Sequence, residues 1–391
     1  MKPYNFFKYF YHGILLLSLT GCGSVVDMIS PAEIDPPANL KEIVKQAKLK
    51  EIWKFDLNMD QDSQYLNLIP KIHKNIIYAA DSEGKVSALG IGTGIPLWTN
   101  SLDTPASGGP GFGDDLVFVG TRDAKLFALN AKNGSIMWEI KVSSEVLSTP
   151  VASGGVVVIK TIDGKISGYE SSSGKNIWNF KYELPSLTLH GSSSPVISGK
   201  RVFCGLANGK LVALNLMSGN LIWEKSISIP MGRSELERLS DVDATPLVFD
   251  GIIFVATYQG EIAALDETKG DLFWRNKFST YSEMSADRYN IYASDSNGHI
   301  WAFDADNGSI RWVQKDIYNR KLSNVSTIKN FLIVGDFEGY IHILSLENGK
   351  IIGRERVSGD AIKNGLRTNK DFIFVQDTGG NLTAFIVNKV R

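Results

Sequence analysis

The stretch SELERLSDVDATPL, residues 234–247, carries the side chains whose type and spacing come nearest to chemistry. Asp241 and Asp243 are two positions apart, and Arg238 precedes them. Paired carboxylates can act as acid and base, hold a metal ion or contact a protein. Side chains at i and i+2 of a strand project from one face, so these carboxylates would be neighbours and not an opposed glycosidase pair. A calcium loop is excluded because an alanine, a threonine and a proline follow.

The other reactive residue types do not assemble into an active site in the sequence. Five histidines lack the spacing of metal ligands. Cys204 lies in the apolar run RVFCGL, which is typical of a small buried hydrophobic residue. The glycine-rich stretch SGGPGFGDD, 107–115, precedes an expected strand and not a helix, so it is a weak phosphate-loop candidate and indicates a turn into an inner strand. We predict no catalysis, no metal and no cofactor.

The N-terminal sequence MKPYNFFKYFYHGILLLSLTGC has the pattern of a bacterial export signal. Lys2 and Lys8 precede an apolar run that is too short to span a bilayer, which predicts a signal peptide over residues 1–21. The run ends at Leu-Thr-Gly before Cys22, and this resembles the lipobox of bacterial lipoproteins. The resemblance implies a diacylglyceryl group on Cys22, and Gly23 in place of aspartate implies the outer membrane. The alternative is an ordinary secretory signal with a chance cysteine.

The composition is that of a globular protein with a substantial core. The 391 residues are 43% hydrophobic and 21% charged. The chain has 41 basic and 42 acidic residues, a net charge of −1. Removal of Lys2 and Lys8 with the signal peptide leaves 39 basic residues, so the mature net charge is −3. Such a chain has no basic field for nucleic acid, and we predict no nucleic-acid partner.

One phrase recurs eight times along the rest of the chain, as in EGKVSALGIGTGIPLW and NGKLVALNLMSGNLIW. Each copy has an anchoring position and, fourteen residues later in the first six copies, a tryptophan. The anchors are Gly84, Ala124, Gly164, Gly209, Gly260, Gly298, Gly339 and Gly380, and the tryptophans are Trp98, Trp138, Trp178, Trp223, Trp274 and Trp312. The seventh copy has Gly353 at the tryptophan position, and the eighth ends before it.

These copies predict a β-propeller. Each phrase is typical of a hairpin with glycine in its loop, and two more short strands lie between phrases. Four strands per repeat at this spacing match a propeller blade. The segment KEIWKFDL, with Trp53, precedes the first copy and can supply the strand that the last copy lacks. We therefore predict an all-β fold of eight four-stranded antiparallel blades with 32 strands, closed by residues near 50–57 as the outer strand of the last blade.

The predicted domain order is a signal peptide over 1–21, the lipidated cysteine with a tether over 22–47, and the propeller over 48–391. Prolines at 31, 36 and 37 indicate an extended, semi-rigid tether, with a short helix beginning near Asn39. The in-phase tryptophans predict packing of each blade against its neighbour. Trp301 is out of phase, and the sequence assigns it only to core or surface packing.

Two connections between blades are longer than the others. The interval from tryptophan to the next anchor is usually 24 to 27 residues, but it is 31 from Trp178 to Gly209 and 37 from Trp223 to Gly260. Both connect the outer strand of one blade to the inner strand of the next, so they share one face of the ring. Leucines in the first and Arg238, Asp241 and Asp243 in the second predict a protein-docking surface, unless the leucines only cap blade ends.

The lipobox, the tether, the blades and the phrases LPSLTLHG and RLSDVDATP together resemble the BamB family of outer-membrane-protein assembly factors over essentially the whole chain. The resemblance implies a non-catalytic lipoprotein that faces the periplasm and binds the POTRA domains of a BamA-type barrel inserter and other subunits. Its docking residues correspond to Leu187, Leu189, Asp241 and Asp243. Where family members have arginine after the second leucine, this chain has His190, which is mostly neutral at pH 7.

Two further hypotheses follow from the blade repeat. Unfolded outer-membrane proteins are possible additional partners, because exposed blade edges can accept an added strand. The alternative to a docking scaffold is a quinoprotein-like propeller that binds a ligand or acts as an enzyme, since the repeat is shared with that family. The adjacent cysteine pair that the quinoprotein resemblance requires is absent from the sequence.

Overall fold

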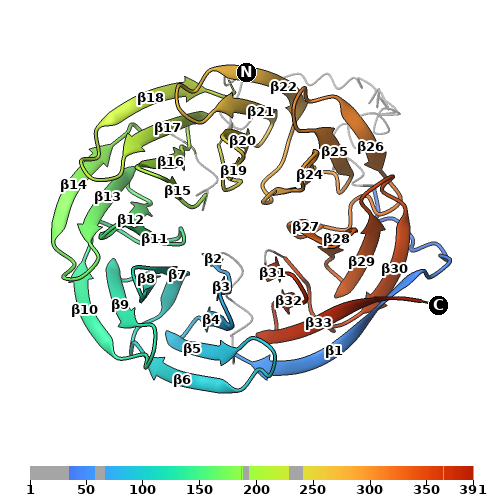
Figure 1. The fold of residues 1–391 in the computed structure, drawn as a ribbon, viewed down its shortest axis with the longest axis horizontal. Coiled ribbons are helices and arrows are strands. Elements are labelled where there is room, and N and C mark those ends of the chain that lie inside the picture. Colours follow the sequence, from blue (N-terminus) through green and yellow to red (C-terminus); the bar gives the residue numbers. More distant parts are fainter. Residues whose placement is uncertain are drawn as a thin grey trace, which may run out of the picture. The chain divides into compact units, whose positions relative to one another are not determined.

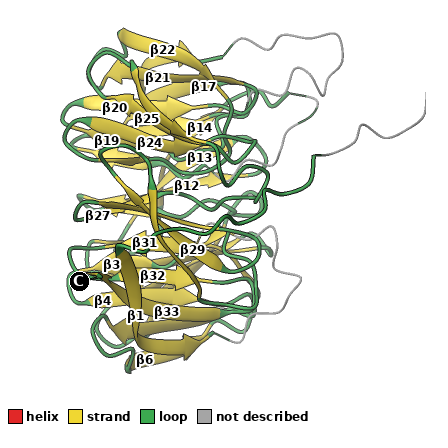
Figure 2. Ribbon diagram, turned by 90° about the vertical axis from the view of Figure 1, so that its right-hand side faces the viewer, coloured by secondary structure: helices red, strands yellow, loops and turns green. Residues whose placement is uncertain are grey.

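Eight blades, each with four antiparallel strands, form a ring, and one short strand of each blade lies at the centre and one long strand at the rim (Figure 1). The computed structural model describes residues 35–57, 67–185, 187, 193–228, 241–363 and 365–390. One compact unit begins at Pro37 and includes the whole ring. Figure 2 shows this unit from the side, with strands crossing between its two faces. The predicted eight-bladed propeller is confirmed.

The blades follow one another in chain order. Blade 1 consists of β3 (Lys71–His73), β4 (Ile76–Ala80), β5 (Lys85–Gly90) and β6 (Pro96–Ser101). Blade 2 consists of β7 (Ala106–Gly113), β8 (Leu116–Thr121), β9 (Lys125–Asn130) and β10 (Ile136–Lys141). Blade 3 consists of β11 (Val151–Ser153), β12 (Val156–Thr161), β13 (Lys165–Glu170) and β14 (Asn176–Lys181). Blade 4 consists of β15 (Val196–Ser198), β16 (Arg201–Gly205), β17 (Lys210–Asn215) and β18 (Leu221–Ser226).

The second half of the ring repeats this arrangement. Blade 5 consists of β19 (Leu247–Phe249), β20 (Ile252–Ala256), β21 (Gly260–Asp266) and β22 (Leu272–Phe278). Blade 6 consists of β23 (Ser285–Ala286), β24 (Asn290–Ser294), β25 (Ile300–Asp304) and β26 (Ile310–Gln314). Blade 7 consists of β27 (Ser326–Ile328), β28 (Phe331–Gly335), β29 (Tyr340–Ser345) and β30 (Ile351–Arg356). Blade 8 consists of β31 (Gly365–Thr368), β32 (Ile373–Gln376), β33 (Asn381–Lys389) and β1 (Ala47–Asp56).

The N-terminal strand closes the ring, as predicted. β1 pairs antiparallel with β33 from Ala47↔Lys389 to Asp56↔Asn381, so it begins a few residues before the expected range. The expected count of 32 strands is one too low for the described residues. The extra strand, β2 (Asn67–Leu68), pairs in parallel with β7 and adds a fifth strand to the sheet of blade 2.

Burial along the strands explains their composition. Middle strands such as β12 are buried at every position, because neighbouring blades cover both faces of each sheet. This is why they are continuous apolar runs and not alternating patterns. Outer strands such as β18 bury mainly the tryptophan position and expose its two preceding residues. The core therefore lies in eight apolar clusters, most of them between two adjacent blades.

Each in-phase tryptophan packs on a glycine of the next blade. A Cβ atom at Gly94 would lie 2.6 Å from the Trp53 ring, and a Cβ at Gly308 would lie 2.6 Å from the Trp274 ring. The same contact recurs at Gly134, Gly174, Gly219, Gly270 and Gly349. These glycines have φ between 66° and 73°, in the left-handed region. Close approach and backbone conformation therefore both require glycine, and the predicted packing between blades is confirmed.

Hydrogen bonds reinforce these contacts between blades. In six of the seven pairs the indole Nε1 donates to a backbone oxygen of the next blade at 2.8–2.9 Å. Trp98, for example, donates to the oxygen of Ala131 at 2.9 Å. The Nε1 of Trp223 is buried without a hydrogen-bond partner among the described residues, although its ring lies on Gly270 in the same way. The ring and its glycine therefore recur in all seven contacts, with or without the indole hydrogen bond.

Blade 7 lacks the tryptophan because the N-terminal chain occupies its place. A Cβ atom at Gly353 would lie 2.5 Å from the backbone oxygen of Ala47. The preceding residue, Gln46, donates its N–H to the oxygen of Ile352 at 2.7 Å and accepts from the N–H of Val390 at 2.8 Å. The start of β1 thus crosses from the outer strand of blade 7 to that of blade 8, and no indole ring fits beneath it.

The expected helix near Asn39 is wrong. Residues 35–46 contain no helix, and residues 38–46 run along blades 6 and 7. Arg320 donates from Nη1 to the oxygen of Ala38 at 3.1 Å, and Arg354 donates from Nη1 to the oxygen of Lys41 at 2.8 Å. Leu40 also packs on the apolar cluster between these blades. Contacts with the propeller, and not local helix propensity, determine the conformation of this segment.

Trp301 is a packing residue of blade 6. Its ring stacks on Phe303 with a centroid distance of 5.9 Å and an interplanar angle of 5°. It also meets Phe278 edge to face, and its Nε1 donates to Oδ2 of Asp295 at 2.9 Å. The out-of-phase tryptophan therefore bridges blades 5 and 6 at a half-buried position.

The contact between tryptophan and glycine predicts a stability difference between two glycine variants. Gly94→Ala should destabilise the protein by about 2–4 kcal/mol, because it combines left-handed strain with overpacking against Trp53. Gly154 has a similar φ of 63°, but a Cβ atom there would meet nothing within 4 Å, so Gly154→Ala should cost only about 1–2 kcal/mol. Thermal melts of both variants test this, and equal decreases in melting temperature would contradict it.

Candidate functional site

Two long connectors begin and end on one face of the ring. The first connector, residues 182–195, joins β14 to β15, and the second connector, residues 227–246, joins β18 to β19. Each connector leaves an outer strand and enters the next inner strand, so its described ends lie on the face opposite the turns that hold Gly94 and its equivalents. Their described ends touch, because Ser193 Oγ donates to the oxygen of Ala244 at 3.4 Å and the N–H of Ser194 donates to Thr245 Oγ1 at 3.3 Å. The two connectors therefore meet where they enter the inner strands.

The predicted site residues fall into three groups. Cys22, Leu189, His190 and Arg238 lie outside the described residues. Leu187 is described and 40% exposed, and Leu184 of the same connector is 41% exposed. Asp241 is only 1% exposed, and Asp243 is partly buried. The structure therefore presents apolar side chains to solvent from the first connector and turns the aspartates of the second toward the protein.

Packing explains the inward position of the aspartates. Residues 241–243 form no strand, so they do not share the strand face expected from their spacing. Val242 between them is 1% exposed, and its side chain occupies the space beside Gly205. Its N–H donates to the oxygen of Leu206 at 3.2 Å, and the oxygen of Asp241 accepts from the N–H of Tyr258 at 3.0 Å. The segment is thus attached to blades 4 and 5 at once.

A buried lysine faces the two aspartates. Lys160 lies in β12, is 7% exposed and donates from Nζ to the oxygen of Gly205 at 3.1 Å. Burial lowers the pKa of its amine, and the charges of Cys204, Asp243 and Asp241 oppose that shift. Lysine is almost never fully buried unless it is paired, so these carboxylates are its natural counter-charges. We call Lys160, Asp241 and Asp243 the buried charge cluster.

Asp243 is the titratable member of this cluster near neutral pH. Burial raises its pKa to about 7, the negative charge of Asp241 raises it as well, and Lys160 lowers it. Its Oδ1 is buried and has no hydrogen-bond partner among the described residues. Sequence analysis missed Lys160, although a single lysine within the apolar run VVVIKT was a usable signal, because every position of that strand is buried.

The other reactive groups are structural. Cys204 is 1% exposed, and burial raises the pKa of its thiol to about 12, as expected for a small buried residue and not a nucleophile. The glycine-rich stretch at 107–115 forms β7 and the turn after it. Among the described residues no group of histidines, cysteines and carboxylates is arranged to hold a metal. No helix in the described part is long and apolar enough to cross a membrane.

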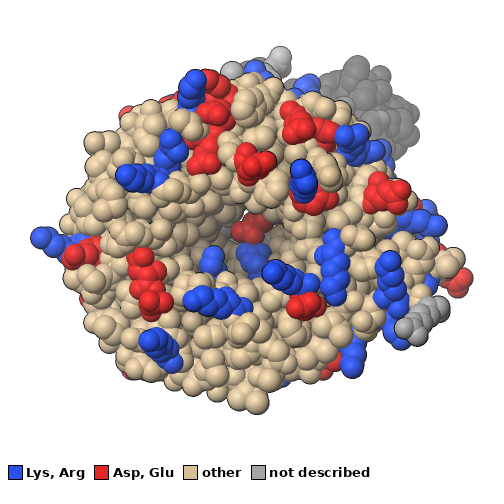
Figure 3. Space-filling model, viewed as in Figure 1, with Lys and Arg blue, Asp and Glu red and all other residues tan. Residues whose placement is uncertain are grey.

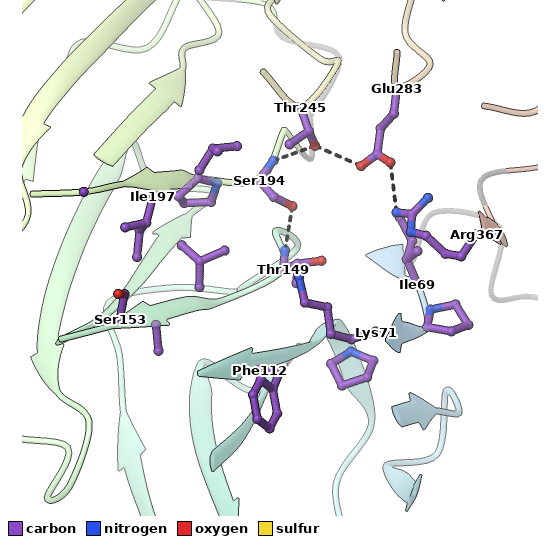
Figure 4. Close-up of a pocket in the computed structure, with 17 residues that line it drawn as sticks. Ile69, Lys71, Phe112, Thr149, Ser153, Ser194, Ile197, Thr245, Glu283 and Arg367 are labelled. Atoms are coloured by element: carbon purple, nitrogen blue, oxygen red, sulfur yellow. Dashed lines mark hydrogen bonds and ion pairs between the residues drawn. The ribbon is translucent and has the colours of Figure 1, made fainter. Parts of the chain in front are cut away.

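The inner strands surround a central channel. Figure 3 shows the ring hollowed at its centre, with basic and acidic atoms inside the hollow. A cavity of about 530 Å³ is lined there by residues of blades 1 to 6 and blade 8. Lys71, Glu283 and Arg367 are the charged residues among them (Figure 4).

A family model and full-length relatives that match this sequence carry the same name. The family model described as "Outer membrane protein assembly factor BamB" matches residues 82–314. A protein of that name from Pseudomonas aeruginosa is 46% identical over 373 residues, which covers 95% of this chain and 97% of the relative. The protein of that name from Escherichia coli is 33% identical over 358 residues, covering 89% and 91%.

Solved structures show the same resemblance in three dimensions. The crystal structure of BamB from Moraxella catarrhalis has a TM-score of 0.79 and 29% identity, covering 87% of this chain and all of that one. Quinohemoprotein alcohol dehydrogenase from Comamonas testosteroni has a TM-score of 0.68 at 13% identity, covering 86% and 76%. At that identity the dehydrogenase shares the propeller fold, which supports many functions.

The raised pKa of Asp243 predicts a pH-dependent component of stability. Its carboxyl ionises near pH 4 in the unfolded chain but stays protonated up to about pH 7 in the folded protein. Stability should therefore fall as the pH rises from about 4 through 7, by on the order of 1–4 kcal/mol from this group. Asp243→Asn removes that component, so its melting temperature relative to the wild type should increase across this range.

An exposed aspartate provides the control for this measurement. Asp250→Asn replaces a solvent-exposed carboxylate and should leave the pH profile parallel to that of the wild type. The other titratable groups in and around the buried charge cluster, among the described residues, are Lys160, Asp241, Cys204 and Tyr182. Both variants retain all four. A parallel profile for Asp243→Asn would contradict the assignment.

Proposed function

Because this chain belongs to the family of the outer membrane protein assembly factor BamB, we propose that it assists the assembly of outer membrane proteins as a non-catalytic scaffold. The proposed partner is a BamA-type barrel inserter, contacted at its POTRA domains. The observation that supports this role is the pair of long connectors, joined at their ends on one face of the propeller. A propeller offers such loops as a composite binding surface.

The exposed leucines of the first connector are the proposed direct contacts. Leu184 and Leu187 are 41% and 40% exposed, and large apolar side chains at that level gain free energy when a partner covers them. Leu189, His190 and Arg238 are proposed members of the same docking surface. A neutral histidine would give up the bidentate contact that arginine makes with a carboxylate, so we expect leucine packing to contribute the larger share of the affinity.

The aspartates of the second connector have a positioning role in this proposal. Asp241 is too deeply buried to contact a partner unless the connector moves, and its charge acts on the buried Lys160. Charge attraction between Lys160 of blade 3 and the two aspartates would therefore hold the second connector against blade 3, while the backbone of Val242 attaches it to blade 4. Loss of both aspartates would weaken docking through displacement of the connector, because a buried lysine without any counter-charge is strongly unfavourable.

The absence of catalysis is likewise part of the proposal. The thiol of Cys204 is buried, and burial raises its pKa. The carboxylates of Asp241 and Asp243 face Lys160 inside the protein and do not face a cleft. Neither group is placed to attack a substrate or to exchange protons with one. Both arrangements favour a binding surface over an active site.

Truncation of Leu187 tests the docking surface. Leu187→Ala should weaken binding to purified POTRA domains of the inserter by about 1–3 kcal/mol, as is usual for a central apolar contact. Leu97 of β6 is 57% exposed but lies on blade 1, away from both connectors, so Leu97→Ala should bind as the wild type does. Calorimetric titration measures both variants. Full binding by the double variant Leu187→Ala/Asp243→Ala would refute the docking proposal.

Lipid attachment at Cys22 is the proposed link to the outer membrane, with the propeller in the periplasm. Cys22→Ala should move the protein from the outer-membrane fraction to the soluble periplasmic fraction, because the acyl chains supply the membrane affinity. Cys204→Ala is the matched control and should stay with the membrane. Mass spectrometry should find a mature N-terminus at residue 22 that carries diacylglyceryl; an unmodified cysteine there would contradict the proposal.

A further inference from the structure

The central channel has a continuous polar wall built from equivalent positions in successive blades. The N–H of Thr149 donates to Ser194 Oγ at 3.0 Å, and the N–H of Ser194 donates to Thr245 Oγ1 at 3.3 Å. Thr245 Oγ1 then donates to Glu283 Oε1 at 3.0 Å. Each of these residues stands two positions before the inner strand of its blade, in blades 3 to 6. Figure 4 shows the chain of contacts around the cavity.

This chain of contacts ends in an ion pair between Glu283 and Arg367, and both oxygens of Glu283 have a partner. Oε1 accepts from Thr245, and Oε2 lies 2.9 Å from Nη2 of Arg367. The Arg367 side chain is 25% exposed and that of Glu283 is 26% exposed, so the pair faces the channel and is not sealed in the core. The carboxylate therefore has a partner for each oxygen without any further cation.

Lys71 is a second cation in the same cavity. It begins β3 in blade 1, and its side chain extends into the space that the polar wall surrounds (Figure 4). No hydrogen bond or ion pair joins its ammonium to another described residue, and the side chain is accessible within the channel. Burial by the wall lowers the pKa of the amine, and the positive charge of Arg367 lowers it further while Glu283 raises it.

The charged residues of the cavity are therefore unbalanced. Lys71 and Arg367 contribute two positive charges, and Glu283 contributes one negative charge. A cation held near another cation in a confined space is stabilised by an anion that it can bind. This imbalance is local, because the whole chain has a net charge of −1.

Apolar side chains complete the cavity. Ile69, Phe112 and Ile197 line it together with Pro110 and Val151. Phe112 is held in place by His73, whose ring stacks on it at a centroid distance of 3.9 Å. The wall thus combines apolar and convergent polar groups, as small-molecule sites do, and a volume of about 530 Å³ is within the usual size of such sites.

We propose that the central channel binds a small organic anion, whose carboxylate or phosphate group contacts Lys71 and Arg367 while its apolar part lies against Phe112 and Ile197. Hydroxyl groups of the polar wall, at Ser194 and Thr149, line the same cavity and are placed to orient the anionic group. Ser194 and Thr245 are also where the two connectors enter the channel. The inference concerns the channel alone and stands independently of the docking surface.

Calorimetric titration of the full mature protein with citrate and, separately, with inorganic phosphate tests the site. Binding of one or both probes should weaken about tenfold or more in Lys71→Met, because a charge-assisted contact is lost. Lys132→Met removes an exposed lysine on blade 2, outside the channel, and should bind within about twofold of the wild type. Citrate binding alone would assign a carboxylate ligand, and phosphate binding alone a phosphate ligand.

A measurement on the wild type keeps the proposal testable if Lys71→Met does not fold. An anion favours the charged form of Lys71, so binding in alkaline buffer should take up a proton, and the heat should depend on the ionisation enthalpy of the buffer. Absence of binding by both probes at millimolar concentration would overturn the proposal. Equal affinities for the wild type and a folded Lys71→Met, or heats independent of buffer, would overturn it as well.

Discussion

The structure depends on the contact between an indole ring and a glycine in the neighbouring blade. The tryptophan projects from an outer strand, and the glycine stands in the turn that precedes the next outer strand. Because a Cβ atom there would overlap the ring, the two residues can only change together. Seven such contacts join the blades in sequence. The first, from Trp53 to Gly94, links the N-terminal strand to blade 1 and so closes the ring.

This contact also separates the two faces of the ring. The turns that hold Gly94 and its equivalents, just before the outer strands, occupy one face. The close contact of each glycine with an indole ring leaves these turns little freedom to accept inserted residues. The connections from outer to inner strands lie on the other face, where extra residues do not disturb the contacts between blades. Both long connectors begin and end there. Gly164, in the turn between β12 and β13, shows how such a connection packs, because a Cβ atom at Gly164 would lie 2.9 Å from the backbone oxygen of Tyr182 in the first connector. Variation in loop length is therefore confined to the face that we assign to docking.

Charged groups within the protein mark two places where the repeat is interrupted. In blade 3 a lysine replaces the apolar side chain expected in a middle strand, and two aspartates of the second connector face it. In the channel the serine and threonine positions of blades 3 to 5 give way to Glu283 in blade 6, which pairs with Arg367, while no ion pair joins Lys71 to another residue of the described part of the chain. Burial makes each charge costly unless it is matched, so both arrangements constrain which groups can lie beside them.

The sequence by itself determined the number of blades, the closing strand and the packing of the tryptophans against neighbouring blades, because these depend on a periodic pattern of residue types. Only the structure showed that each ring lies on a glycine. It also located the two long connectors by counting residues. The orientation of Asp241 was decided only by tertiary structure, since Val242 must fill the space beside Gly205 and thereby turns its neighbours inward. Lys160 and the aspartates are about 80 residues apart, and no local pattern relates them. The channel likewise brings together Lys71, Glu283 and Arg367 from three blades, because closure of the ring places inner strands that are distant in sequence around one axis.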